Sequence, residues 1–228
     1  MTHSPPPLWR RALAEFVGTG LLVTVVVGSG IAAQRLSPND IGLQLLENSI
    51  ATALGLAVLI ALFQRVSGAH YNPVVTIVDR ALGAPHGTGA IGAYLLAQVL
   101  GGIAGALLAN LMFETPTSFS TTDRATPGHL LGEVVATAGL ILVIFALSRT
   151  GRAVVVAPMV GAYIGAAYWF TSSTSFANPA VTIGRIFTDT FAGIAPASAW
   201  WFLVAQLIGA ALGAGLVLLI FPNRKAQP

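Results

Sequence analysis

Two copies of an Asn-Pro motif constrain the fold of this chain more than any other feature. They read Asn72-Pro73-Val74-Val75-Thr76 and Asn178-Pro179-Ala180-Val181-Thr182, about a hundred residues apart. Asn is a favoured N-cap of helices, and Pro at the first helical position lacks only an N–H that would have no partner there. Each copy therefore predicts the start of a short helix.

Long apolar runs surround both motifs. Of the 228 residues, 55% are hydrophobic and 8% are charged, with a mean hydropathy of +0.79. In an ordinary soluble protein about 25% of residues are charged. Six runs are long enough to cross a bilayer, at about residues 12–33, 41–64, 90–113, 130–147, 154–170 and 199–221. Each Asn-Pro motif opens a further apolar segment of about half that length. We therefore predict an all-α membrane protein with six transmembrane helices and two re-entrant half-helices.

The two halves of the chain match in order. Glu15 lies in the opening segment of the first half and Glu133 in that of the second, while Gln98 and Gln206 follow the two Asn-Pro segments. Each half contains three spans, an odd number, so the halves must insert in opposite directions. We expect one channel-like domain over residues 1–228, built from inverted repeats at about 8–115 and 126–223. The two half-helices would then enter from opposite faces and meet near the midplane.

The distribution of basic residues predicts the orientation. With the N-terminus inside, eight Lys and Arg residues lie in inside segments and three in outside segments. The inside residues are Arg10, Arg11, Arg65, Arg80, Arg149, Arg152, Arg224 and Lys225, and the outside residues are Arg35, Arg124 and Arg185. Cytoplasmic loops carry the excess of Lys and Arg. Both termini are therefore expected in the cytoplasm, with the protein spanning the inner (plasma) membrane.

The two half-helix starts predict a path for uncharged solutes. Each N-terminus carries unpaired N–H groups and about half a positive charge, so two such ends at one point repel cations. The side-chain oxygens of Asn72 and Asn178 can cap those N–H groups, which leaves their NH₂ groups as donors to a passing hydroxyl. The non-helical residues before each Asn would offer backbone carbonyls, and such backbone is tolerated in a membrane only beside a cavity or within protein.

The chain resembles the aquaporin, or major intrinsic protein, family along nearly its whole length. Residues 67–76 resemble the first pore loop of the family, except that Val74 replaces the usual alanine, and Asn178-Pro179-Ala180 matches the second. The resemblance implies a right-handed bundle with a pore in each subunit, assembled as a homotetramer in the lipid bilayer. It also implies that Glu15 and Glu133 brace the backbone of the pore loops.

The main departure from the family pattern follows the second motif. The family usually has Arg directly after Asn-Pro-Ala, and this chain has Val181. In the family this Arg helps to form the outer constriction of the pore, which is its selectivity filter. Family spacing places the other filter residues at Thr52, at Ser175 and at a position in the fifth span. For that position Trp169 is taken first, and Tyr168 and Ala166 stay open. With Thr52 and Val181 the constriction is expected to be wider, more apolar and less charged than that of a water channel.

A wide, apolar filter favours uncharged solutes larger than water. Glycerol, urea, boric acid and arsenous acid meet this description. The combination of Thr52 and Val181 is similar to that of prokaryotic aquaglyceroporins linked to arsenic resistance. This resemblance implies arsenite or methylated arsenicals as the first substrates and glycerol as the next, with water and urea as further candidates.

Arg185 and His70 each have two interpretations. Arg185 lies four residues after Val181, on nearly the same helix face, and could guard the outer mouth. The spacing favours the alternative, which is an i,i+4 pair with Asp189 or a contact with loop carbonyls. His70 could line the pore as a gate or solute contact, or it could fix the shape of its loop, and the sequence favours neither.

An ordinary water-selective aquaporin and, less favoured, a coupled secondary transporter are the alternatives. A coupled carrier would need carboxylates at the midplane, and neither Asn-Pro motif has one within five residues. The sequence contains no Cys, no His, Asp or Glu cluster with metal-ligand spacing, and no nucleophile–base pair or cofactor motif. We therefore expect no enzyme activity, no metal or cofactor, and no nucleic-acid partner.

Overall fold

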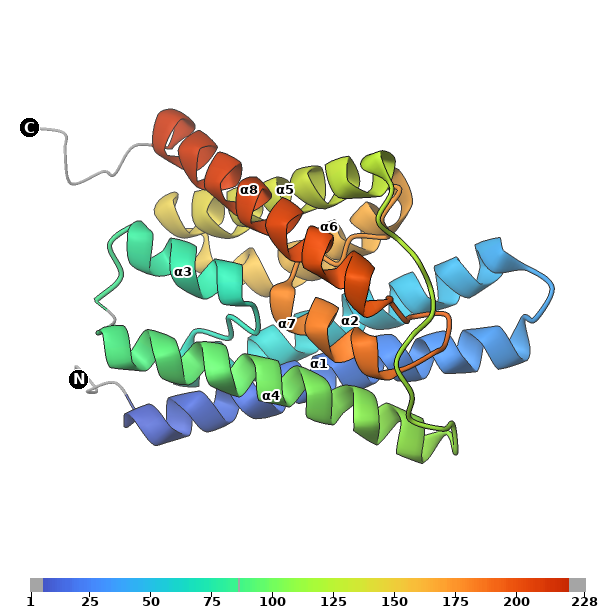
Figure 1. Ribbon diagram of the computed structural model, residues 1–228. Helices are drawn as coiled ribbons and strands as arrows, with labels where there is room; N and C mark the ends of the chain where they lie inside the picture. The colour runs from blue at the N-terminus through green and yellow to red at the C-terminus, as the bar shows by residue number, and fades with distance from the viewer. Residues whose placement is uncertain (1–5, 86, 222–228) are drawn as a thin grey trace, which may run out of the picture.

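The computed structural model describes residues 6–85 and 87–221, and every regular element within them is a helix (Figure 1). The long helices are α1 (Leu8–Leu36), α2 (Ile41–Ser67), α4 (Thr88–Met112), α5 (Pro127–Arg149), α6 (Val156–Phe170) and α8 (Pro196–Ile220). The short helices are α3 (Pro73–Ala81), α7 (Pro179–Gly184) and two 3-10 helices, η1 (Ala153–Val155) and η2 (Arg185–Phe187). Arg224 and Lys225, which the orientation argument counts, lie outside the described residues.

Six helices are long and apolar enough to cross a membrane, as the sequence predicts. They are α1, α2, α4, α5, η1 joined to α6, and α8. Each helix covers the apolar run predicted for it to within one residue, since the runs at 90–113 and 199–221 end one residue beyond α4 and α8. Most of the helices also extend beyond their run, because hydropathy marks the apolar centre of a helix and not its polar ends. Large apolar side chains on several of these helices are exposed, such as Leu54 (64%), Leu111 (76%) and Leu219 (81%), which suits contact with lipid. The predicted fold class is confirmed.

The two Asn-Pro motifs begin the short helices α3 and α7, as predicted. The side-chain oxygen of Asn72 accepts from the Val74 amide at 3.1 Å, and that of Asn178 accepts from the Ala180 amide at 2.9 Å. Helix α7 is shorter than α3 and continues as η2. A Cβ atom on Gly184, its last residue, would lie 2.5 Å from the carbonyl oxygen of Gly102, so α7 ends in close contact with α4.

Equivalent helices pack in equivalent ways in the two halves. Helix α1 lies along α4, α5 lies along α8, and the start of α1 and the end of α8 lie at the same end of the bundle (Figure 1). A Cβ atom added to Gly105 would lie 2.1 Å from the carbonyl oxygen of Gly20, and one added to Gly213 would lie 2.6 Å from the carbonyl oxygen of Ala138. These two glycines thus let the backbones of each pair approach closely, which small residues permit in membranes.

Replacement of Gly105 by alanine is expected to destabilise the fold by about 1–3 kcal/mol or more, because the new methyl group forces α1 and α4 apart. Gly92, in the same helix, is the matched control, since a Cβ atom there meets nothing within 4 Å. Gly92→Ala should be neutral or stabilising by up to about 1 kcal/mol through helix propensity. Unfolding titrations in detergent micelles measure both variants, and equal effects would contradict the packing argument.

Candidate functional site

The N-termini of α3 and α7 meet through a reciprocal pair of hydrogen bonds. The Nδ2 atom of Asn72 donates to Ala177 O at 2.8 Å, and the Nδ2 atom of Asn178 donates to Tyr71 O at 2.8 Å. Each asparagine amide therefore binds the carbonyl that immediately precedes the other asparagine. A carboxamide nitrogen carries two hydrogens, so each side chain keeps a second N–H beyond this pair.

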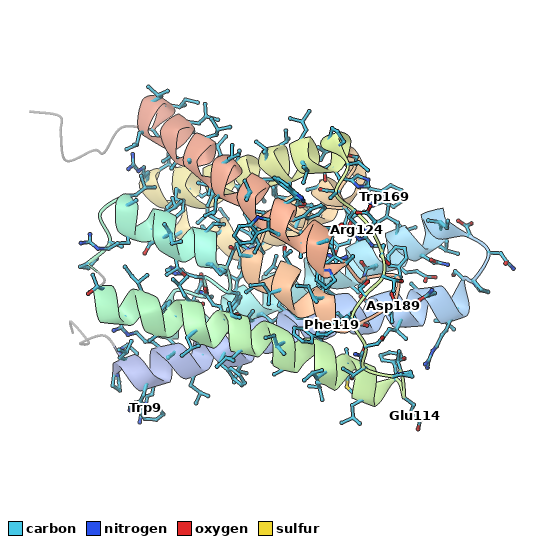
Figure 2. All side chains as sticks on the ribbon, viewed as in Figure 1. Trp9, Glu114, Phe119, Arg124, Trp169 and Asp189 are labelled. Carbon is cyan, nitrogen blue, oxygen red and sulfur yellow. The ribbon has the colours of Figure 1, made fainter. Side chains whose placement is uncertain are left out.

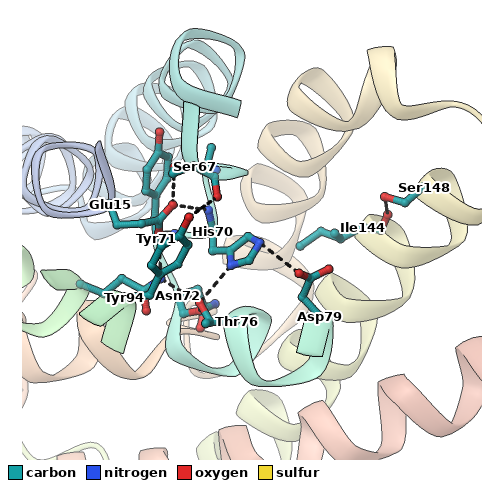
Figure 3. Close-up of polar contacts among 12 residues, drawn as sticks. Glu15, Ser67, His70, Tyr71, Asn72, Thr76, Asp79, Tyr94, Ile144 and Ser148 are labelled. Atoms are coloured by element: carbon teal, nitrogen blue, oxygen red, sulfur yellow. Dashed lines mark hydrogen bonds and ion pairs between the residues drawn. The ribbon is translucent and has the colours of Figure 1, made fainter. Parts of the chain in front are cut away.

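Glu15 holds the loop in front of α3 (Figure 3). Its Oε1 atom accepts from Ser67 Oγ at 2.6 Å and from the His70 amide at 3.0 Å. Its Oε2 atom accepts from the Tyr71 amide at 2.7 Å and from Gln98 Nε2 at 2.8 Å. One fully buried carboxylate thus binds two successive backbone amides of the loop.

Glu133 holds the loop in front of α7 in the same way. Its Oε1 atom accepts from the Phe176 amide at 2.8 Å, and its Oε2 atom accepts from the Ala177 amide at 2.8 Å and from Gln206 Nε2 at 2.6 Å. The Nε2 atom of Gln206 also donates to Thr182 in α7 at 2.8 Å, as that of Gln98 donates to Thr76 in α3 at 2.9 Å. The sequence offered one signal for the two glutamines, which is their recurrence in both halves.

Both loops contain non-glycine residues in the left-handed region. The φ angles are 52° at Ala69, 50° at Tyr71, 51° at Ser175 and 48° at Ala177. Each such residue costs roughly 1–2 kcal/mol, and a hydrogen bond to a charged group stabilises by about 1.5–3 kcal/mol. The glutamate contacts are therefore of the size needed to offset the backbone strain, which turns the loop amides toward the carboxylates.

A cavity of about 100 Å³ passes between the two half-helices. A single water needs roughly 10–15 Å³ on the same measure, so the cavity has room for several waters or one small solute. Its apolar wall includes Leu22, Val26, Leu56, Ile60, Leu140, Val160 and Ile164. Its polar groups come from His70, Asn72, Thr52, Tyr168, Ser175, Asn178 and Arg185.

Three of the four predicted filter residues line this cavity, and Trp169 does not. Thr52, Ser175 and Val181 are part of the wall. Trp169 is 51% exposed and donates through Nε1 to Ser49 Oγ at 3.1 Å, at the periphery of α6 (Figure 2). The choice of Trp169 was wrong because neighbouring helix residues point about 100° apart. Tyr168, one of the alternatives, lines the cavity, and its OH lies 3.2 Å from Thr52 Oγ1.

The two departures from the family motif lie in different surroundings. Val74 is 0% exposed and packs against Val78, Ile141 and Val217, away from the cavity wall. Pro73 is also buried, and Ala180 is 0% exposed. Val181 is the departure that faces the cavity.

His70 lies where the cavity meets a wider one of about 630 Å³. Its Nδ1 atom is 3.1 Å from Thr76 Oγ1, and its Nε2 atom is 3.7 Å from Asp79 Oδ2 (Figure 3). The side chain thus contacts its own half-helix and also forms part of the wall, so both interpretations of this residue are compatible with its position.

Arg185 lines the opposite end of the cavity. Its Nε donates to the carbonyl of Ala192, and its guanidinium lies 3.4 Å from the centroid of the Phe176 ring. The predicted contact with loop carbonyls is present. Arg185 brings a cation to the cavity that Val181 also lines, and the expectation of a constriction less charged than that of a water channel stays a prediction.

Asp189, the alternative partner predicted for Arg185, binds elsewhere. Its Oδ1 atom accepts from the Thr121 amide at 2.9 Å, and this hydrogen bond holds the pKa of the Asp189 carboxyl below its usual range. Residues 6–85 and 87–221 contain no group of three or more His, Cys, Asp and Glu side chains that could hold a metal ion.

Comparison with known proteins agrees with this architecture. The model of the major intrinsic protein family matches residues 2–173. An aquaglyceroporin, AqpS, from Rhizobium meliloti (strain 1021) is 48% identical over 212 residues, covering 92% of this chain and 89% of that protein. Aquaporin NIP6-1 from Arabidopsis thaliana is 30% identical over 243 residues, covering 98% of this chain and 74% of that protein.

A solved structure shares the fold. The X-ray structure of the aquaglyceroporin from Plasmodium falciparum has a TM-score of 0.72 and 21% identity, and the match covers 95% of this chain and 98% of that one. Six spans, two half-helices joined at their Asn-Pro ends, and a family model that matches most of the chain lead to one assignment. The chain belongs to the major intrinsic protein family of aquaporins and aquaglyceroporins, and it is a membrane channel, not an enzyme.

Proposed function

We propose that the chain is a passive channel of the aquaglyceroporin type for small uncharged solutes. Arsenite and methylated arsenicals are the first substrates, glycerol is the next, and urea and water are further candidates. The observation that carries this proposal is that Val181 and Thr52 both face the cavity, where an arginine directly after the second motif would narrow it. The aquaglyceroporin AqpS, which is 48% identical, supports the same solute class.

The residues that line the cavity include both hydrogen-bonding groups, which suit the hydroxyls of a solute, and apolar side chains, which suit its carbon atoms. The remaining N–H groups of Asn72 and Asn178 supply donors at the point where the half-helices meet, and the loop residues Gly68, Ala69 and His70 line the same cavity. Leu56, Ile60 and Val160 give no hydrogen bonds on the apolar wall. A neutral polyol can therefore exchange its waters for protein groups on one side, while an ion would lose most of its hydration shell.

In this proposal Glu15 and Glu133 support the pore loops and do not bind the solute. Both are 0% exposed, both accept from loop amides, and neither contributes to the cavity wall. This arrangement also disfavours coupled transport, because a proton- or sodium-coupled carrier needs a carboxylate that its ion can reach. A water-selective aquaporin is disfavoured by the wall at Val181 and Thr52.

We further propose that the protein is one channel domain of inverted repeats, that it forms a homotetramer in the inner (plasma) membrane, and that both termini are cytoplasmic. The equivalent packing of α1 on α4 and of α5 on α8 supports the repeat. Arg65 and Arg149 end α2 and α5 at the end of the bundle where α1 starts, which supports a cytoplasmic position for that end. The end with Arg185 is then the outer one.

Purified protein in proteoliposomes tests the solute class by stopped-flow light scattering. Arsenite, glycerol and urea gradients should give fluxes that rise linearly with concentration, do not depend on membrane potential and have a low activation energy. Empty liposomes are the control. Saturating or potential-dependent flux would favour a carrier, and uptake of water alone would contradict the proposal.

Val181→Arg is expected to lower glycerol permeability by at least about tenfold, which corresponds to about 1.4 kcal/mol on the barrier. The added guanidinium would fill the cavity beside Val181, where water still passes more easily than glycerol. Val181→Ala removes volume and should leave glycerol permeability equal or higher. Proteoliposome swelling measures both variants, and an unchanged glycerol rate in Val181→Arg would exclude this position from the filter.

Glu133→Gln is expected to destabilise the protein by roughly 1–3 kcal/mol for each buried amide left unpaired, and to reduce solute flux. The neutral side chain has one acceptor oxygen in place of two and turns an NH₂ group toward other donors. Glu114→Gln, at an exposed position in the loop after α4, is the matched control and should change neither property. Detergent unfolding and proteoliposome flux measure both; equal stability of the two variants would argue against a bracing role.

A further inference from the structure

Two arginines contact the ring of Phe176 at the end of the bundle opposite His70. The guanidinium carbon of Arg185 lies 3.4 Å from the ring centroid, and that of Arg124 lies 5.5 Å from it. Both side chains also donate to carbonyls of one loop, Arg185 to Ala192, and Arg124 to Gly193 at 2.8 Å and Phe191 at 2.9 Å. Arg124 and Arg185 therefore both support the loop at residues 191–193.

The two arginines differ in what they face. Beyond the cavity between the half-helices lies a second cavity of about 440 Å³, which we call the vestibule, lined by residues that include Gln34, Thr122 and Asp189. Arg124 lines the vestibule, near Asp189 at the same end of the bundle (Figure 2). Arg185 lines both cavities. It is therefore the arginine that a solute passes on its way from one to the other.

The side chain of Arg185 is held in place with donors to spare. It is 2% exposed, its planar guanidinium lies over the Phe176 ring, and its Nε is bound to Ala192. A guanidinium has five N–H donors, and Nη1 and Nη2 donate to none of the described residues. Ser175 lines the same cavity, and its buried Oγ atom has no hydrogen-bond partner within the described chain.

We propose that Arg185 is the specificity-determining cation of this pore, one helical turn beyond the position that Val181 occupies. Its fixed positive charge repels small cations at the junction of the two cavities. Its free N–H groups, together with the hydroxyl of Ser175, orient neutral solutes that carry several oxygen atoms. Placement of the charge one turn farther out leaves the wall at Val181 apolar, so the pore combines cation exclusion with passage of solutes larger than water.

This inference rests on the proposed channel function and extends it to one residue. A narrow path lined by one sign of charge changes the local concentration of small ions by about 10- to 1,000-fold. Removal of the Arg185 charge should therefore change the ratio of cation permeability to glycerol permeability far more than it changes the flux of glycerol itself.

Proteoliposomes with Arg185→Gln, Arg185→Lys and the matched control Arg124→Gln test the assignment. The readouts are methylammonium uptake and glycerol permeability, with gel filtration to confirm folding. Arg185→Gln should raise the methylammonium-to-glycerol ratio at least about tenfold, Arg185→Lys should restore exclusion because it keeps the charge, and Arg124→Gln should leave the ratio unchanged. An unchanged ratio in folded Arg185→Gln, or an equal rise in Arg124→Gln, would overturn the proposal.

A second variant serves if Arg185→Gln does not fold. Val181→Glu places a carboxylate four residues before Arg185, within reach of its guanidinium, and should weaken cation exclusion with Arg185 intact, although the half-helix N-termini still repel cations. Unchanged exclusion in Val181→Glu would overturn the assignment. Glycerol flux in the unmodified protein separates the proposed channel function from the proposed role of Arg185. Absence of this flux contradicts the channel function. Glycerol flux in the unmodified protein, together with unchanged cation exclusion in the variants, contradicts only the role of Arg185.

Discussion

The structure depends on two hydrogen bonds that cross between the pore loops, from the amide of each asparagine to the carbonyl before the other. A membrane gives irregular backbone no water to bind, so each loop must find its partners within the protein. The loops solve this problem jointly. Asn72 and Asn178 satisfy Ala177 O and Tyr71 O, while Glu15 and Glu133 satisfy the amides on the other side of each loop. The asparagine N–H groups that these contacts leave over belong to residues that line the cavity.

The two halves share this solution and differ at their ends. His70, next to the first motif, contacts Thr76 and lies near Asp79 at one end of the cavity. Around the second motif, Phe176 lies two residues before Asn178 and Arg185 follows the motif, at the other end of the cavity. The two halves can therefore share the contacts that hold the pore loops while the two ends of the cavity are lined by different residue types. Here the framework residues Glu15 and Glu133 are buried and paired, whereas the residues that line the two ends of the cavity differ.

Most of the fold could be predicted from the sequence, because it follows from local signals. Apolar runs locate the six spans, and the Asn-Pro pairs locate the starts of α3 and α7. The site was harder to predict. Trp169, Tyr168 and Ala166 all stay open on the sequence, because the length of the loop between α6 and the second motif does not fix the rotation of α6 about its axis. Helix spacing favours either a pair with Asp189 or a contact with loop carbonyls for Arg185. The carbonyl contact is present, whereas the pair is not, because α7 gives way to a 3-10 helix at that residue and Thr121 from a distant loop binds Asp189.

In the proposed channel, solutes move through the cavity between the half-helices, past Val181 and not past Val74. The chain has no cysteine, so a single introduced thiol is the sole target for a thiol reagent. Val181→Cys and Val74→Cys, each in proteoliposomes, can be treated with a small mercurial while glycerol flux is recorded. We expect the reagent to block flux in Val181→Cys and to leave it unchanged in Val74→Cys, because Val181 lines the cavity and Val74 is buried in the helix packing. Block in Val74→Cys, or free flux through labelled Val181→Cys, would contradict the proposed path.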